Sequence, residues 1–460
     1  MIHLFSRGPL GLVFVSSVLI GVAANRLYAV DSSLSLSTQL TSPKEDEQWS
    51  VGSRHYLTWV PATGKADTVR LAFSSTAGAD WKTIADKAPN TGKYLWKVPD
   101  AVSTGCQIEI SWPASRSPSR VQFSIIPSRQ VLNYQWVNVT TTAAYAPRDG
   151  AGALVFRDHL WLLGGWSPAD KLYFPRICNN EVWSSKDGSL WTLVKPNTFE
   201  DDTFDSTKDW EGRHTGGYAV YKNKLWIVGG DANQGHYHDD VWNSEDGRDW
   251  TWVNKGRGVP WGPRGLHYTL VFKDKIWVMG GQTMPKMVPS AEVFYRDVWN
   301  TMDGIDWMQV RPVEPYWPAR GMIGGNVVFN GRMWILGGGT YDTPTTPFRR
   351  FFGDVWSSAD GVHWRHDVKV APWPPRQYHE VAVFDDRMWV LEGSNEPGVS
   401  RNDVWYSADG VNWYELPGTP WGPRHAASVF VHANALWMLG GSDRGKMGKD
   451  VWKLARVRRD

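Results

Sequence analysis

A block of eleven residues recurs along the chain and constrains the fold more than any other feature. It reads "DVWNSEDGRDW" at 240–250, close copies begin at residues 181, 297, 354 and 403, and a shortened copy, "DVWKL", begins at residue 450. The Trp at its third position returns every 47 to 59 residues. A repeat of about 50 residues predicts one supersecondary unit per copy, packed against its neighbours.

A second block precedes each copy, as in "AVYKNKLWIVGG" at 219–230 and "LVFKDKIWVMGG" at 270–281. An aromatic residue or His ends its first half, five residues before a Trp. The polar or small residues between them predict two strands joined by a tight turn, followed by a double Gly. The Asp-Gly pair of the first block predicts another two-residue turn, since such turns require positive φ angles. Each unit is therefore expected to contain four antiparallel strands.

The shortened last unit lacks the segment that would form its fourth strand. The stretch at 133–150 begins with the missing piece, because Trp136 stands where Trp191 and Trp413 stand in complete units. A fourth strand donated in this way would close a ring and remove exposed sheet edges. We therefore predict an all-β chain in which residues 129–460 form a six-bladed β-propeller.

The double Gly, its spacing to an aromatic residue and the "DVW" strand together resemble the kelch repeats of the galactose-oxidase-like superfamily. Glu392 departs from this pattern, since "LEG" replaces "LGG" in the fifth unit. The "S-x-D-G-x-x-W" core, as in 244–250, is also similar to the Asp-box of sialidase-like propellers but is one residue shorter. In that family the Asp-box is a turn motif away from the active site, so the likeness implies a structural role.

Residues 30–128 contain no such repeat. Short alternating or apolar runs, separated by Gly, Pro, Ser and Asn, predict a small β-sandwich. The segments "SPKEDEQWSVGSRHYLTW", "DWKTIADKAPNTGKYLWKVP" and "CQIEIS" resemble the immunoglobulin-like (Ig-like) domain of the Ser/Thr-rich cell-wall protein family. The resemblance implies a surface or wall-associated module, and a plain spacer is the alternative.

The N-terminus has the pattern of an export signal. An uncharged apolar run at 8–24 follows Arg7, and small residues permit cleavage after Ala24 or after Ala29. Residues 1–29 are thus a signal peptide or, alternatively, an uncleaved signal anchor, the only membrane attachment expected. Either way the protein is expected to be secreted, periplasmic or on the cell surface.

Charge and cysteine content exclude other classes of function. The 49 basic and 47 acidic residues leave a formal charge of +2, which gives no reason to expect a nucleic-acid partner. Cys106 and Cys178 fall in different predicted domains, so neither a disulfide framework nor a structural zinc site is expected. We expect no cofactor, and a monomer.

Arginines stand at one position in the links between units, before each predicted innermost strand. Five precede the strand-closing aromatic residue or His by eight residues and one by nine: Arg148, Arg213, Arg264, Arg320, Arg376 and Arg424. His214, His267, His379 and His425 lie within three residues of them. This set could bind a carboxylate, a sulfate or an acidic peptide. Alternatively, each Arg pairs with an Asp of a neighbouring blade, such as Asp240 or Asp403.

The loops before the "DVW" strands differ between units and lie on the face where function is expected. Trp166 and Tyr173 are aromatic residues that could stack on a sugar, or simply pack within their loop. "GHYHDD" places His236 and His238 on one side of an extended chain, which allows a metal site, with a solvated loop as the alternative.

Three functions remain open. The first is an exported binding protein that recognises a glycan or a protein through the loop face. The second, implied by the likeness to six-bladed kelch sialic-acid mutarotases, is acid–base catalysis on an acidic sugar by Arg376, Tyr378, Glu380 and Glu392. The third is a cell-surface scaffold. A copper oxidase is not expected, because Cys178 lacks the context of a Tyr–Cys crosslink, and a sialidase is not expected because "YFPRI" at 173–177 scrambles the sialidase motif.

Overall fold

The computed structural model describes residues 39–45, 47–61, 67–112, 117–126, 134–167, 174–202, 204–321 and 324–457. All regular structure in these residues is β-strand, which confirms the all-β prediction. Among them there is accordingly no helix of the length and apolarity that crossing a membrane requires. The predicted export segment, residues 1–29, lies outside the described residues.

Two sheets form the N-terminal region and share one hydrophobic core that includes Trp49, Leu71, Ile108 and Phe123. The first sheet has the order β1 (Leu40–Ser42), β3 (Arg54–Trp59), β6 (Lys93–Lys97). The second has the order β2 (Gln48–Ser50), β8 (Ser119–Ile126), β7 (Ser103–Ser111), β4 (Thr68–Ser74), β5 (Lys82–Pro89).

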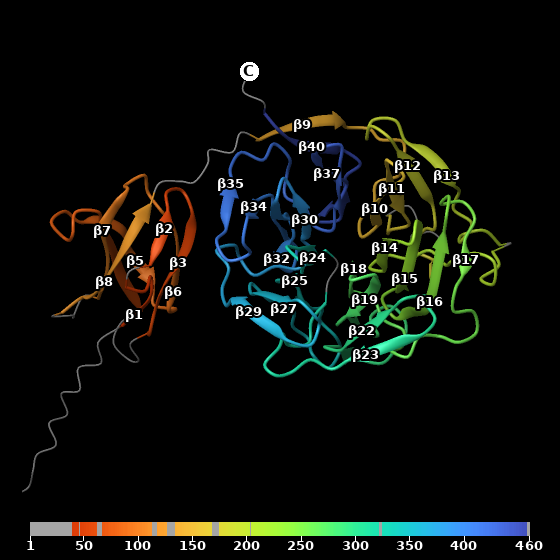
Figure 1. Ribbon diagram of the computed structural model, residues 1–460, viewed down its shortest axis with the longest axis horizontal. Coiled ribbons are helices and arrows are strands. Elements are labelled where there is room, and N and C mark those ends of the chain that lie inside the picture. The colour runs from red at the N-terminus through yellow and green to blue at the C-terminus, as the bar shows by residue number, and fades with distance from the viewer. Residues whose placement is uncertain are drawn as a thin grey trace, which may run out of the picture. The chain divides into compact units, whose positions relative to one another are not determined.

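Six four-stranded antiparallel sheets make up the repeat region, and we number them 1 to 6 (Figure 1). Sheet 1 contains β10 (Gly152–Phe156), β11 (His159–Leu163), β12 (Val182–Ser185) and β13 (Thr192–Lys195). Sheet 2 contains β14 (Gly217–Tyr221), β15 (Lys224–Asn233), β16 (His236–Ser244) and β17 (Thr251–Trp252). Sheet 3 contains β18 (Tyr268–Phe272), β19 (Lys275–Met279), β22 (Val298–Thr301) and β23 (Trp307–Val310).

The remaining three sheets follow the same order. Sheet 4 contains β24 (Asn326–Phe329), β25 (Arg332–Leu336), β28 (Val355–Ser358) and β29 (Trp364–Val368). Sheet 5 contains β30 (Glu380–Phe384), β31 (Arg387–Leu391), β34 (Val404–Ser407) and β35 (Tyr414–Leu416). Sheet 6 contains β36 (Ser428–His432), β37 (Ala435–Leu439), β40 (Val451–Arg456) and β9 (Tyr134–Thr140).

The pairing of β9 with β40 confirms the strand donated from the start of the repeat region. The two strands run antiparallel, with Trp136 opposite Leu454. A backbone bond also joins sheet 6 to sheet 1, because the Gly150 N–H donates to the Ala426 carbonyl oxygen at 3.1 Å. In Figure 1, β9 (gold) lies beside the blue strand β40.

A tight turn joins the first two strands of every sheet, as the sequence predicts. Both turn residues have positive φ in all six, for example Lys222 at +48° and Asn223 at +56°. This is the backbone of a two-residue hairpin turn that matches the twist of the strands. The Trp five residues after the strand-closing residue donates its Nε1–H to that residue's carbonyl oxygen, as Trp226 does to Tyr221 at 2.8 Å. The repeated five-residue spacing thus allows each Trp to form this hydrogen bond.

The Asp-Gly turn differs from the prediction. In sheet 2, β16 ends at Ser244 and β17 begins only at Thr251, and of the pair only Gly247 has positive φ, at +76°. Asp246 Oδ1 accepts the N–H groups of Arg248 and Asp249, both at 2.9 Å. The carboxylate therefore organises a longer loop through side-chain hydrogen bonds, and a two-residue turn was wrong here.

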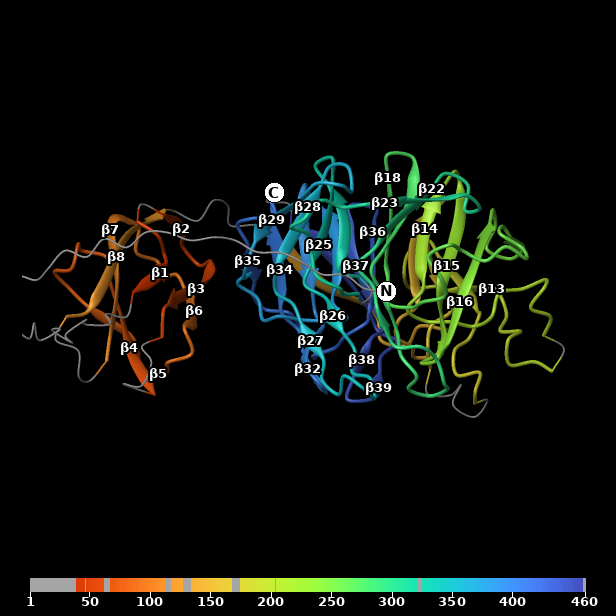
Figure 2. The same cartoon turned by 90° about the horizontal axis from the view of Figure 1, so that it is seen from below.

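Short two-stranded hairpins extend the loops between the second and third strands in sheets 3 to 6. They are β20 (Gln282–Thr283) with β21 (Val293–Phe294), β26 (Gly339–Thr340) with β27 (Arg350–Phe351), β32 (Ser394–Glu396) with β33 (Val399–Ser400), and β38 (Ser442–Asp443) with β39 (Lys446–Met447). Figure 2 shows β26, β27, β32, β38 and β39 at the same end of the sheets. The most variable segments of the repeat therefore meet at one end.

Candidate functional site

The six link arginines form ion pairs within the repeat region, in which the guanidinium groups are buried or nearly so and the carboxylates are partly exposed. Arg213, for example, donates from Nη1 and Nη2 to Asp240 at 2.6 and 3.0 Å, and from Nη1 to the Gly229 carbonyl oxygen at 3.1 Å. Trp242 Nε1 donates to the same carboxylate at 2.7 Å. The equivalent pairs are Arg148–Glu181, Arg264–Asp297, Arg320–Asp354, Arg376–Asp403 and Arg424–Asp450.

These contacts favour the alternative in which the arginines stabilise the sheets, with one correction. Each Arg pairs within its own sheet, because Asp240 belongs to the sheet that Arg213 precedes, whereas the sequence suggested a neighbouring blade. Burial raises the pKa of Asp240, but the guanidinium of Arg213 outweighs it and lowers that pKa to about 2. The charge of this Arg is thereby neutralised inside the protein.

The residue after each Arg occupies what we call a mouth position. It forms an antiparallel bridge with the residue that follows the double Gly, or in the fifth unit the Glu392-Gly393 pair. The six bridges are Asp149–Trp166, His214–Asp231, Gly265–Gln282, Gly321–Gly339, Gln377–Ser394 and His425–Ser442. The backbone is thus repeated at these positions while the side chains differ.

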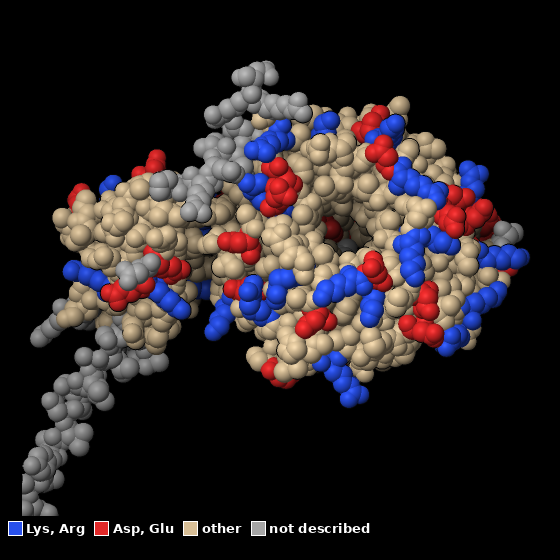
Figure 3. Space-filling view, viewed as in Figure 1, with Lys and Arg blue, Asp and Glu red and all other residues tan. Residues whose placement is uncertain are grey.

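A cavity of about 410 Å³, which we call the mouth cavity, opens among these positions and the short hairpins. Its wall combines acid–base, aromatic and basic side chains, including Asp149, Trp166, His214, Tyr341, Tyr378 and His425. Lys286, Arg349 and Arg444 also line it. Figure 3 displays the face at the other end of the six sheets from the short hairpins, and a hollow is visible there too, with basic and acidic side chains interspersed around it.

His214 is held by a buried carboxylate at this wall. Its Nδ1 lies 3.1 Å from Asp231 Oδ1 and 3.8 Å from Cys178 Sγ, and the Thr215 hydroxyl donates to Asp231. Burial lowers the pKa of His214, but Asp231 outweighs burial and raises that pKa well above its usual value. His214 is therefore a cation at neutral pH.

Asp149 stands one sheet away from His214 in the same mouth position. Burial raises the pKa of Asp149 to about 7, even though the neighbouring His214 opposes the shift. A carboxyl group with this pKa can both give and take a proton near neutral pH.

Another part of the cavity wall is basic and aromatic. The guanidinium of Arg349 lies 3.6 Å from the centre of the Tyr341 ring, and Lys286 Nζ lies 4.1 Å from the same centre. Asp342 pairs with both, at 2.7 Å to Arg349 Nε and 3.7 Å to Lys286 Nζ. Tyr378, at φ +53°, packs edge-on against Tyr341 with ring centres 6.3 Å apart.

Two predicted acids lie outside the wall of the mouth cavity. Glu380 lines a second cavity of about 200 Å³ formed by the innermost strands, and burial raises its pKa to about 8. Glu392 is fully buried, and its pKa is raised well above the usual value by burial and then by Glu380. Of the four residues predicted for catalysis, only Tyr378 lines the mouth cavity, since Arg376 pairs with Asp403.

The predicted histidines and loop aromatic residues do not all line the mouth cavity. His267 and His379 are buried, with Nδ1 of the first 2.9 Å from Thr269 Oγ1 and Nε2 of the second 2.8 Å from the Leu336 carbonyl oxygen. Trp166 lines the mouth cavity, and Tyr173 lies outside the described residues.

The sequence prediction did not include Asp149, Asp231, Lys286 or Arg349. One signal was available for Asp149, because it directly follows an Arg of the repeated link. The same register would have selected His214 and His425 for the mouth positions. Lys286 and Arg349 come from unrepeated loops, and no repeated spacing marks them.

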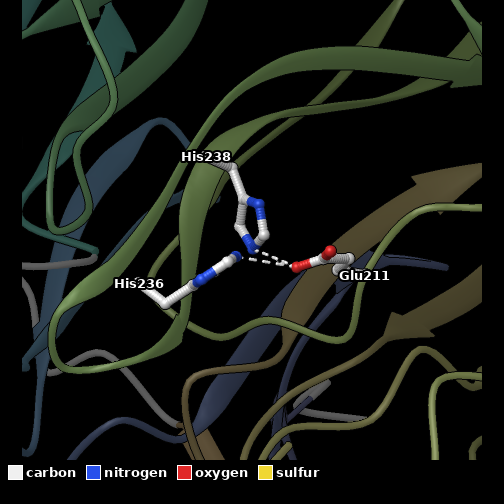
Figure 4. A group of neighbouring side chains, drawn as sticks. All are labelled: Glu211, His236 and His238. Atoms are coloured by element: carbon white, nitrogen blue, oxygen red, sulfur yellow. Dashed lines mark hydrogen bonds and ion pairs between the residues drawn. The ribbon is translucent and has the colours of Figure 1, made fainter. Parts of the chain in front are cut away.

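His236 and His238 do lie together, and Glu211 completes a group of three metal-ligand side chains (Figure 4). This group is not part of the mouth cavity wall. Comparison of the chain with protein-family models and with curated proteins finds no match.

Proposed function

We propose that residues 129–460 form a closed six-bladed β-propeller of kelch type, and that the exported protein binds an acidic sugar or glycan in the mouth cavity. Support for the ring comes from the six equivalent sheets, the β9–β40 pairing and the bond between Gly150 and Ala426. The Ig-like assignment of the N-terminal region is supported by its two sheets around one core.

The observation that carries the binding proposal is the composition of the mouth cavity. Aromatic faces at Trp166, Tyr341 and Tyr378 suit the apolar face of a sugar ring. Lys286 and Arg349 supply positive charge on the same wall, which suits a carboxylate. A volume of about 410 Å³ is in the range of pockets that take small ligands.

The test is a binding screen by saturation-transfer nuclear magnetic resonance (NMR) with acidic sugars such as sialic, glucuronic and galacturonic acid, beside their neutral analogues. We expect binding of at least one acidic sugar, weakened about tenfold by Lys286→Gln, because loss of a charged contact of about 1.4 kcal/mol has that effect. Lys224→Gln is the matched control, since both lysines pair with an acid and their side chains are 37% and 35% exposed. Absence of binding across the panel contradicts the proposal.

A second function, mutarotase or epimerase chemistry on an acidic sugar, is favoured by one observation. Asp149, with a pKa of about 7, and the protonated His214 share the wall of the mouth cavity. Ring opening of a sugar needs a proton removed from the anomeric hydroxyl and a proton given to the ring oxygen, and an acid–base pair can supply both.

This function is tested by following anomer exchange of the bound acidic sugar by NMR. Catalysis predicts faster exchange with the wild-type protein, lost in Asp149→Asn while binding persists. If the sugar binds but its anomers exchange no faster than in the free sugar, catalysis is contradicted and only the binding function remains.

A further inference from the structure

The side chains of Glu211, His236 and His238 converge at the end of the long hairpin of sheet 2. The two histidines begin β16, and residues two apart on a strand point to the same side. Glu211 comes from the link before sheet 2 and approaches both rings (Figure 4). Its Oε2 lies 2.9 Å from His236 Nε2 and 3.8 Å from His238 Nε2.

His238 is the unusual member of this group. It is 7% exposed, and its Nε2 is a buried atom with no hydrogen-bond partner among the described residues. A buried polar atom without a partner is costly, and such atoms are rare in folded proteins. The hydrogen bond between His236 and Glu211 leaves this nitrogen unexplained, because the carboxylate lies beyond hydrogen-bond distance from it.

The hairpin that carries the histidines is anchored independently of them. Asn233 Oδ1 accepts the N–H of His236 at 3.2 Å, and Asn233 Nδ2 donates to the Pro175 carbonyl oxygen at 2.9 Å. The backbone that positions the two rings is therefore fixed without an ion. Such preorganisation reduces the ordering that a ligand must bring about.

We propose that Glu211, His236 and His238 form a zinc-binding site. The three ligand atoms lie within 4.8 Å of one another. A tetrahedral Zn²⁺ with bonds of about 2.0–2.2 Å needs donor atoms about 3.3–3.5 Å apart, so small side-chain movements suffice. Two imidazoles and one carboxylate favour zinc over Mg²⁺ or Ca²⁺, which prefer all-oxygen sites.

With three protein ligands, a fourth coordination position remains for water, on the side of the half-exposed His236.

The experiment is a calorimetric titration of the full chain, freed of metal with a chelator, with zinc chloride. We expect one Zn²⁺ per chain, and affinity at least about a hundredfold lower in Glu211→Gln and in His236→Ala. Substitution with Co²⁺ gives a second readout, because intense visible absorption reports tetrahedral coordination. His363→Ala is the matched control, since His363 pairs with Asp360 at 2.8 Å and the described residues place no third metal ligand beside them.

His236→Ala keeps the test valid if His238→Ala destabilises the protein, because the His236 side chain is 51% exposed. No Zn²⁺ uptake by the wild type, or uptake unchanged in both Glu211→Gln and His236→Ala, overturns the proposal. Sugar binding is measured separately with chelator present, so the two proposals fail independently.

Discussion

Asp149 and His214 occupy the same position in successive units, each one residue after an arginine that pairs with an acid of its own sheet. The repeated Arg fixes the backbone, and the unrepeated residue beside it reaches the mouth cavity. The repeat therefore contributes to the site through the side chains that differ between units at an equivalent backbone position. This arrangement lets one repeated frame present different residues at the same position, and Asp149, His214 and His425 line the cavity while the equivalent residues of sheets 3 and 4 are glycines.

The pKa of Asp149 predicts how ligand binding depends on pH. Because this pKa is raised to about 7, Asp149 is mostly neutral at pH 6 and mostly ionised at pH 8. An acidic sugar would then meet a like charge in the cavity, and we expect its affinity to fall about fivefold to tenfold over this range. Asp149→Asn should remove most of the dependence, as measured by calorimetric titration at both pH values.

The control is Asp158→Asn, because Asp158 is an exposed hairpin-turn residue with positive φ, a conformation that Asn also tolerates. That variant should keep the wild-type pH dependence. Affinity that rises from pH 6 to pH 8 in the wild type would place the ligand away from Asp149.

The packing of sheets is tested by two glycines with the same backbone angle. Gly247 and Gly262 both have φ of +76°, but a Cβ on Gly247 would overlap the Trp161 ring of sheet 1, whereas Gly262 faces open space. Gly262→Ala should cost about 1 kcal/mol of unfolding free energy, through backbone strain alone. Gly247→Ala should cost on the order of 3 kcal/mol, because overpacking adds to the strain.

Urea unfolding followed by tryptophan fluorescence measures both changes. Equal costs for the two variants would mean that the Trp161 ring moves aside freely, and that Asp-Gly turns do not hold neighbouring sheets together.

Much of the repeat region could be predicted from the sequence, because its determinants are local. The two-residue turns follow from the short polar interval between two apolar halves, as at Lys222 and Asn223. The Asp-Gly loop was predicted too short, because its geometry depends on side-chain bonds such as those of Asp246. The identity of the Asp-Gly pair alone does not reveal those hydrogen bonds.

The candidate sites were less predictable, since they depend on contacts between distant segments. His236 and His238 are two residues apart and were found, but Glu211 is separated from them by two strands. Glu380 and Arg376 were chosen for their proximity in sequence, yet Glu380 faces the inner cavity and Arg376 pairs with Asp403. Tyr378, with its positive φ, lies between them, and the backbone turn there directs the two side chains to different sites.

The link ion pairs predict that substitutions of two arginines differ greatly in their effect on the free energy of unfolding. Arg376 is fully buried and pairs with Asp403, whose side chain is 18% exposed, so Arg376→Met should leave a largely buried carboxylate without its partner and cost about 3 kcal/mol of stability. Arg257→Met should cost less than about 1 kcal/mol, because the Arg257–Asp306 pair is exposed. Comparable unfolding free energies in urea would show that the link arginines do not stabilise the sheets.

Glu380 predicts a stability that falls with increasing pH. Its folded pKa of about 8 lies above the ordinary value of 4.5, so between these values the unfolded chain binds fewer protons than the folded one. Stability therefore decreases as pH rises through this window. Glu380→Gln should therefore raise the free energy of unfolding at both pH values. The increase at pH 8 should exceed the increase at pH 5 by on the order of 3 kcal/mol.

Glu396→Gln on an exposed hairpin serves as the control and should have the same effect at both pH values. Thermal or urea unfolding at pH 5 and pH 8 measures the difference. A stabilisation by Glu380→Gln that is larger at pH 5 would contradict the raised pKa.

The central claim, that the mouth cavity is the ligand site, is tested most directly at Met287. This side chain lines the cavity and is 44% exposed, while Met308, 54% exposed, lies on β23 and outside the cavity wall. Methyl-labelled methionines can be followed by NMR during titration with the best acidic sugar of the screen, with Met287→Leu to assign the signal. We predict a saturable shift of the Met287 methyl signal and none of Met308. A saturable shift at Met308, with Met287 unchanged, would contradict the account.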